Sequence, residues 1–143
     1  MAIIQAKTLF RTVLKANGYS EIYDEPFNND NVADTYADKS YNLVLGSVSQ
    51  GSASAVDLEL SVPITLNIYF HGGREVQQTI DDKVIPLCED LIADLMNVAN
   101  RSGTVVKNLT LTSFNISPYQ IDTNERALRA SLDFDVISYL CVD

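Results

Sequence analysis

The stretch of residues 56–70 constrains the fold more than any other part of this sequence. Every even position in it is apolar, and nearly every odd position is polar. Because successive side chains of a strand point to opposite faces, one face suits a core and the other suits water. At ~3.3 Å per residue the stretch would span about 50 Å, far more than an ordinary strand. Pro63 cannot donate to a strand ladder, so we expect a bulge or edge position there, between an arm (residues 56–62) and a core strand (residues 64–70).

Length and composition favour one globular domain covering residues 1–143. The chain is 46% hydrophobic and 20% charged, which is typical of a soluble protein with a real core. It contains no apolar run of the ~20 residues that a membrane span needs, and its start lacks the layout of a signal peptide. The net charge of −9 argues against a protein that binds nucleic acid by neutralising phosphates. Cys88 and Cys141 fall inside predicted elements, so we expect buried free thiols and a cytosolic setting.

Residues 2–17 are predicted to form an amphipathic helix that ends at Gly18. Lys7, Arg11 and Lys15 repeat every four residues and form a basic stripe along it. The stripe is either a solvated face or a contact for an acidic surface. The next segment supplies one, with six acidic residues and no Lys or Arg between positions 21 and 38. The acids of this segment lack the spacing and the glycine of a calcium-binding loop, so no metal is expected.

Residues 41–48 are predicted to form a strand, followed by a loop over residues 49–55 that has no charge and no large side chain. Antiparallel pairing across this loop would place Tyr41 near Pro63 and make a projecting hairpin with a flexible tip. The tip is our candidate interaction site, together with the basic stripe. Its residues are Ser49, Gln50, Gly51, Ser52, Ala53 and Ser54.

Helical periodicity returns over residues 75–100, with an apolar arc from Ile80 that is wide enough to need cover from two directions. Asp81 or Asp82 is expected to cap this helix and Pro86 to lie in its first turn. Two strands follow, over residues 105–116 and from Ala127 onward. The fold prediction is therefore α+β in the order α-ββ-α-ββ. It has an antiparallel or mixed sheet of about four strands, a projecting hairpin and two main helices packed on one face.

No residues carry a recognisable chemistry. His71 is the only histidine and has no nucleophile placed near it by a motif. Asp133 and Asp135 lie two apart on one strand face, where solvated carboxylates are common, so acid–base catalysis is not expected. We accordingly predict no catalytic residue, no cofactor and no metal, and hence no enzymatic activity.

The whole-chain layout resembles the tail terminator proteins of long-tailed bacteriophages, the tail-to-head joining family. The resemblance covers the first helix, the acidic segment, the long alternating strand, the second helix and the closing hairpin, above all residues 129–136 with their strict alternation. It implies a structural virion protein that assembles in the host cytoplasm. The implied assembly is a homohexameric ring that caps the tail tube and meets the head connector or stopper, with DNA passing only through the lumen.

Two other classes of function remain open. One is a different head–tail joining protein, such as a stopper or head-completion ring, or a tail-tube-like subunit. The more remote one is a small-molecule enzyme on an α+β scaffold.

Overall fold

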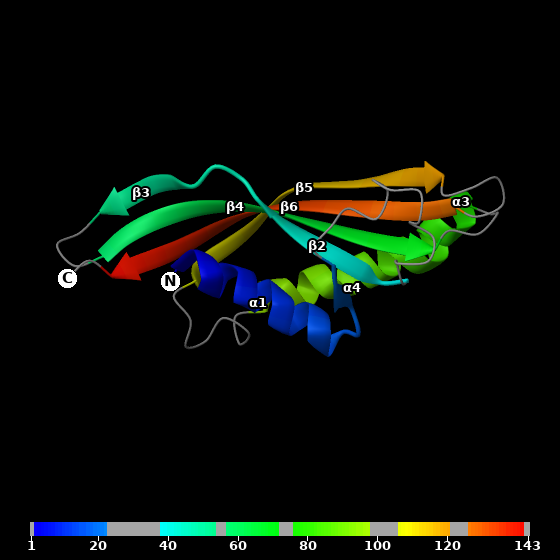
Figure 1. The fold of residues 1–143 in the computed structure, drawn as a ribbon, viewed down its shortest axis with the longest axis horizontal. Coiled ribbons are helices and arrows are strands. Elements are labelled where there is room, and N and C mark those ends of the chain that lie inside the picture. Colours follow the sequence, from blue (N-terminus) through cyan, green and yellow to red (C-terminus); the bar gives the residue numbers. More distant parts are fainter. Residues whose placement is uncertain are drawn as a thin grey trace.

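The computed structural model describes residues 2–22, 38–53, 57–71, 76–97, 106–120 and 126–141. They form two layers, a twisted sheet with helices on one of its faces (Figure 1). The helical elements are α1 (Ala2–Ala16), α3 (Val76–Thr79), the π-helical turn η1 (Ile80–Val84) and α4 (Ile85–Met96). The strands are β1 (Ser20–Glu21), β2 (Ser40–Leu45), β3 (Ser49–Ala53), β4 (Asp57–His71), β5 (Val106–Gln120) and β6 (Arg126–Cys141).

The α+β class and the placement of the helices on one face confirm the prediction, but the strand count and order do not. The sheet has six strands among the described residues, in the order β1-β2-β4-β6-β5, with β3 pairing with β4 beyond the end of β2. Along the chain, four strands separate the helices where two were expected. The additional strands are β1, which is only two residues long, and β3, which forms where a loop was predicted.

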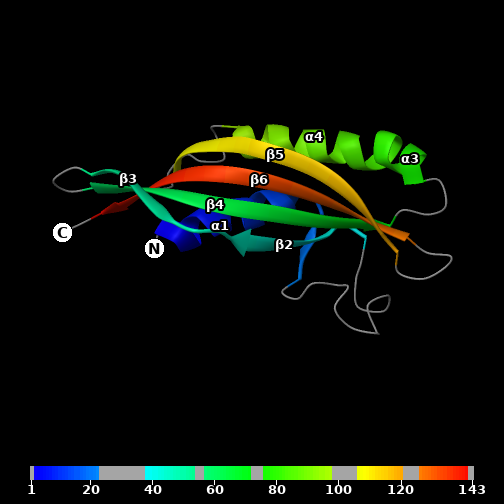
Figure 2. The same ribbon diagram turned by 90° about the horizontal axis from the view of Figure 1, so that it is seen from above.

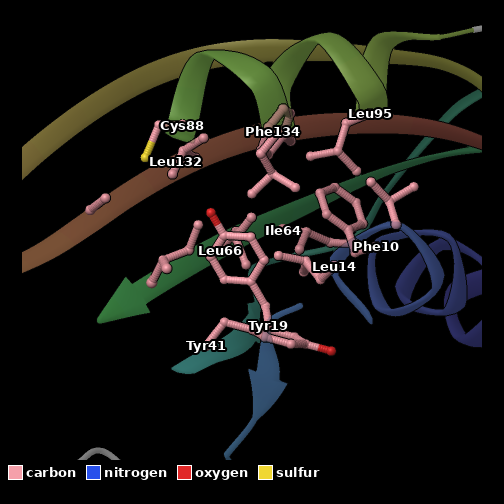
Figure 3. Close-up of a cluster of buried hydrophobic side chains, with 14 of the residues drawn as sticks. Phe10, Leu14, Tyr19, Tyr41, Ile64, Leu66, Cys88, Leu95, Leu132 and Phe134 are labelled. Carbon is pink, nitrogen blue, oxygen red and sulfur yellow. The ribbon is translucent and has the colours of Figure 1, made fainter. Parts of the chain in front are cut away.

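The two longest strands, β4 and β6, form the centre of the sheet. They pair antiparallel without a break from Asp57 opposite Cys141 to His71 opposite Ala127. Even positions of β4 lie opposite even positions of β6, so the apolar side chains of both strands share one face. This face packs against the helices, with Phe10 of α1 in an edge-to-face contact with Phe134 of β6 at 5.2 Å between ring centroids (Figure 3).

The predicted hairpin has the wrong register. Tyr41 lies opposite Ile68, and Leu45 lies opposite Ile64, so β2 belongs to the body of the sheet. The part that projects is three-stranded, because β3 and β6 pair with the two sides of the first half of β4. We call this part the arm and define it as residues 49–53, 57–61 and 137–141. Figures 1 and 2 both show it extending past the start of α1.

The second helical segment begins at Val76, before the predicted cap at Asp81 or Asp82, and contains a π-helical turn that ends two residues before Pro86. Proline has no N–H to donate and its ring clashes with the carbonyl four residues earlier, and a wider turn accommodates both effects. Asp81 and Asp82 lie inside this turn, so the prediction that one of them caps the helix is wrong. The predicted cover from two directions is confirmed, since α4 packs against both the sheet and α1.

Helix α1 ends one residue earlier than predicted, in a glycine C-cap. Gly18 has φ +86°, its N–H donates to the carbonyl of Lys15, and the N–H of Tyr19 donates to the carbonyl of Leu14. This pair of hydrogen bonds is the Schellman motif. It turns the chain directly into β1 and brings the Tyr19 ring to the core, where it meets Phe70 edge-on.

We predict that Gly18→Ala lowers the free energy of unfolding by about 1 kcal/mol, because a Cβ is disfavoured at positive φ. Added bulk does not explain this loss, since a Cβ at Gly18 would meet its nearest neighbour, the Lys39 Nζ, at an ordinary 3.6 Å. Gly18→Asn is the matched control and should cost clearly less, because Asn tolerates this conformation. Urea denaturation of the three proteins measures the difference, and equal losses for Ala and Asn would contradict the explanation.

Candidate interaction surfaces

The predicted interaction residues at the chain's glycine- and serine-rich segment lie on the outer strand of the arm. Ser49 is opposite Ser61, Gln50 is opposite Leu60 and Ala53 is opposite Leu58. The Ser49 and Gln50 side chains are exposed. Residues 51–53 are therefore strand rather than flexible tip, and Ser54 lies outside the described residues.

A glycine–proline contact separates the arm from the body of the sheet. Pro63 does not divide β4, which runs straight through it; the interruption falls on the neighbouring strand, between β2 and β3. The N–H of Gly46 donates to the Pro63 carbonyl at 2.8 Å, while Pro63 has no N–H to return. A Cβ at Gly46 would lie 2.9 Å from the Pro63 Cγ, so the close approach requires glycine. The predicted bulge or edge position at Pro63 is therefore wrong for β4, which pairs with β6 without a break; the interruption falls on the neighbouring strand.

One residue of the basic stripe of α1, Arg11, forms an ion pair within the chain. Arg11 Nε donates to both carboxylate oxygens of Glu21, at 3.0 and 3.1 Å, and so ties α1 to β1. At this one position the stripe contacts the acidic segment, as the second of the two alternatives has it; most other acids of that segment lie outside the described residues. Lys15 is exposed and Lys7 partly exposed, so these two amines keep the stripe basic toward solvent.

The sheet face away from the helices carries a hydroxyl–carboxylate network that the sequence did not reveal. Asp133 accepts hydrogen bonds from Thr65 Oγ1 on β4 and Ser113 Oγ on β5, each at 2.6 Å. Asp135 accepts one from Ser61 Oγ on β4, also at 2.6 Å. The alternation in β4 and β6 was visible in the sequence, but the partners depend on the register between strands. We call this surface the polar face.

The same network determines the protonation of Asp133. The hydrogen bonds from Ser113, first, and from Thr65 hold the pKa of Asp133 below its ordinary value of 3.8, against the opposing effect of burial. A carboxylate held ionised in this way is an acceptor in a structural network and is poorly suited to act as a general acid near neutral pH.

The Cys88 side chain is placed for packing. Cys88 is a free thiol in the core, and burial raises its pKa to about 12, so it is not a nucleophile at neutral pH. The side chains of His71 and Cys141 lie outside the described part of the chain. Within that part, no group of three or more His, Cys, Asp and Glu side chains could hold a metal ion together.

The exposure of four large apolar side chains to solvent was also not predicted from the sequence. Ile4, Val44, Leu45 and Phe114 are 51%, 48%, 39% and 39% exposed. Val44, Leu45 and Phe114 fall within predicted strands. Their exposure could not be predicted, because a strand at the edge of a domain has the same periodicity as a central one.

None of the helices in the described ranges is long and apolar enough to cross a membrane. No protein-family model matches this sequence, and no curated protein matches it significantly. Function is therefore argued from the chain's own surfaces.

The Asp133 network gives a pH-dependent prediction. Since the folded-state pKa lies below the ordinary value of 3.8, the ionised carboxylate stabilises the fold above that pH. This contribution is lost as the pH falls through the folded-state pKa. The difference in unfolding free energy between the wild type and Asp133→Asn should therefore be largest near pH 6 and shrink below the ordinary pKa of the carboxyl.

Chemical denaturation of the two proteins across this pH range measures that difference. Ser113→Ala should reproduce part of the pH dependence, because it removes the hydrogen bond with the largest effect on the Asp133 pKa. A difference that stays constant with pH would show that the fold does not favour the ionised form.

Proposed function

We propose that this chain is a tail terminator of a long-tailed bacteriophage, a structural subunit whose ring caps the tail tube and joins it to the head connector. The ring is a homohexamer that assembles in the host cytoplasm and stays in the virion neck. The proposal starts from the resemblance of the whole-chain layout to this family. The structural observation that supports it most is the arm.

The arm gives a small subunit a stiff extension for contacts outside its own core. It is three-stranded, so the central strand β4 has hydrogen-bonded neighbours on both sides there. On the helix-side face, Leu58 and Leu60 continue the apolar phase of β4 beyond the start of α1 and remain partly exposed. A projecting apolar strip on a rigid support is suited to packing on the next subunit of a ring or on the last ring of the tube.

The charge distribution is compatible with a conduit for DNA. The net charge of −9 disfavours adhesion to phosphates, and Asp133 on the polar face is held ionised by its hydroxyl partners. The described reactive groups also favour a structural role over an enzyme, since the Cys88 thiol is buried and the Asp133 carboxylate is engaged by two hydroxyls.

A null allele of this gene in its phage tests the proposal. A terminator mutant should make tails of uncontrolled length that do not join heads, because nothing ends growth of the tube. Complementation with the wild-type gene should restore normal tails. Tails of normal length beside heads that lose DNA would indicate a stopper instead. Intact infectious particles would contradict any role in joining.

We further predict that deleting residues 50–54 abolishes joining while the domain stays folded. The described residues of this segment pair only with β4 of the arm, and none of them belongs to the buried core. Circular dichroism should show a folded protein, and complementation of the null allele should fail. Thr12→Ala, on the exposed side of α1, is the control and should complement fully. Full complementation by the deletion would show that β3 makes no essential contact.

A further inference from the structure

The exposed apolar side chains lie on two opposite margins of the subunit. Ile4 on α1 and Leu45 on β2 belong to one margin, and Phe114 on β5 belongs to the other. Figure 2 shows β2 and β5 on opposite sides of the body of the sheet, with α4 running along β5; of the described strands, only the two-residue β1 lies outside β2. Isolated exposed apolar residues are ordinary, but two sets on opposite margins of one sheet can be complementary to each other.

The first margin combines apolar and basic groups. Ile4 precedes Arg11 by seven residues, about two helical turns, so both lie on the same flank of α1. Arg11 binds Glu21 of β1, which places this flank on the β1–β2 side of the subunit. Lys7 and Lys15 lie on the same flank, beside Ile4.

The second margin combines apolar groups with one carboxylate, that of Glu89. Phe114 lies opposite the buried Leu132, so its side chain is on the helix-side face of the sheet at the outer strand. On α4, Ile92 and Met96 are only partly buried, and helical spacing places Glu89 on their flank.

This flank of α4 points away from α1. Asp90 lies on the other flank, on the side of Tyr19, three residues beyond the end of α1; the pKa of Tyr19 is raised chiefly by burial and further by Cys88, Asp38 and Asp90. The flank with Glu89, Ile92 and Met96 therefore belongs to the β5 margin.

The directions of the strands allow the two margins to meet. β2, β4, β6 and β5 alternate in direction, so β5 runs antiparallel to β2. A second copy in the same orientation would thus bring its β2 antiparallel to β5 of the first. Both edges are open among the described residues, since β1 pairs only with Ser40 and Tyr41 of β2, and the only strand paired with β5 is β6. Open strand edges favour pairing with another chain.

We propose that the β5–α4 margin of one copy binds the β2–α1 margin of the next, head to tail, with the sheet continuing between copies. This contact is heterologous, so it closes into a ring when the rotation between copies allows. The inference rests on the proposed function for its setting and adds to it the surfaces that make the ring.

In this arrangement the apolar side chains of the β5 edge meet those of the β2 edge, and the polar side chains of the two edges also meet. On the helix side, Phe114 of one copy meets Leu43 and Leu45 of the next, all of which share the apolar phase of the sheet. On the polar face, Asn115 comes into line with Asn42. Beneath the sheet, the Glu89 carboxylate on this flank of α4 faces the Lys7 and Lys15 flank of α1 in the next copy, which favours this orientation over a contact between two identical margins.

Crosslinking with single cysteines tests these surfaces. In a Cys141→Ser background, only the buried Cys88 and the introduced thiols remain. Leu45→Cys and Phe114→Cys proteins are prepared separately, mixed, and treated with a short bis-maleimide, with and without tail tubes. The mixture should give a covalent dimer, while each protein alone should give at least tenfold less. A chain carrying both cysteines should give a ladder that ends at the ring size.

The possible outcomes distinguish a failure of the proposed contact surfaces from a failure of the proposed terminator function. A dimer from Phe114→Cys alone would overturn the proposal in favour of a symmetric β5–β5 contact. Rings on tube ends with no crosslinked product would overturn the surfaces and leave the terminator function standing. A full ladder from a protein that does not cap tubes would support the surfaces and contradict the function. No assembly in either condition would overturn both.

A second measurement compares how two Asp substitutions change the yield of the crosslinked dimer. Phe114→Asp places a carboxylate in the apolar half of the contact and should reduce at least tenfold the crosslinked product of Val44→Cys with a partner carrying Asn115→Cys, two positions that share the polar face. Thr12→Asp in the same partner, on the exposed side of α1, is the control and should change the yield less than twofold. Equal effects of the two substitutions would contradict the placement of the contact.

Discussion

The pairing of β4 with β6 is the interaction on which the rest of this structure depends. Fifteen consecutive residue pairs in one register keep the apolar side chains of both strands on the same face for the whole length of the sheet. A slip by one residue would turn one strand's apolar set toward water, so the hydrophobic effect strongly specifies the register. The core, the polar face and the arm are all consequences of this one alignment.

The helices cover only part of these long strands. The uncovered parts are the arm and the two margins that we propose as contact surfaces. Beyond α1, the strands continue as the arm, held on its outer side by β3. The contact between Gly46 and Pro63 lets the neighbouring strand stop and resume, so β2 serves the body and β3 serves the arm. At the sides, α1 and α4 leave apolar groups exposed on two opposite margins, whose strand directions and charges suit repeated head-to-tail contact.

The sequence predicted the elements that periodicity encodes and missed those that depend on tertiary contacts. The long strand, both main helices and the closing hairpin follow from apolar spacing. Strand β3 could not be predicted, because Ser, Gln, Gly and Ala have little strand preference and pair there only because β4 offers its edge. The hairpin register was wrong because the loop was assumed to begin where side chains become small, while the break is set by Gly46 and Pro63. Among the candidate site residues, Arg11 could be connected to an acidic partner, but Thr65 and Ser113 could be assigned to Asp133 only with the register known.

The measurement that tests the terminator account most directly is cryo-electron microscopy of the head-proximal end of purified tails assembled in the presence of this chain. The account predicts a single closed ring of six copies on the last ring of the tube, with the arm of each copy in contact with a neighbour or with the tube. Absence of this chain from that end, or its presence as a single copy, would contradict the account.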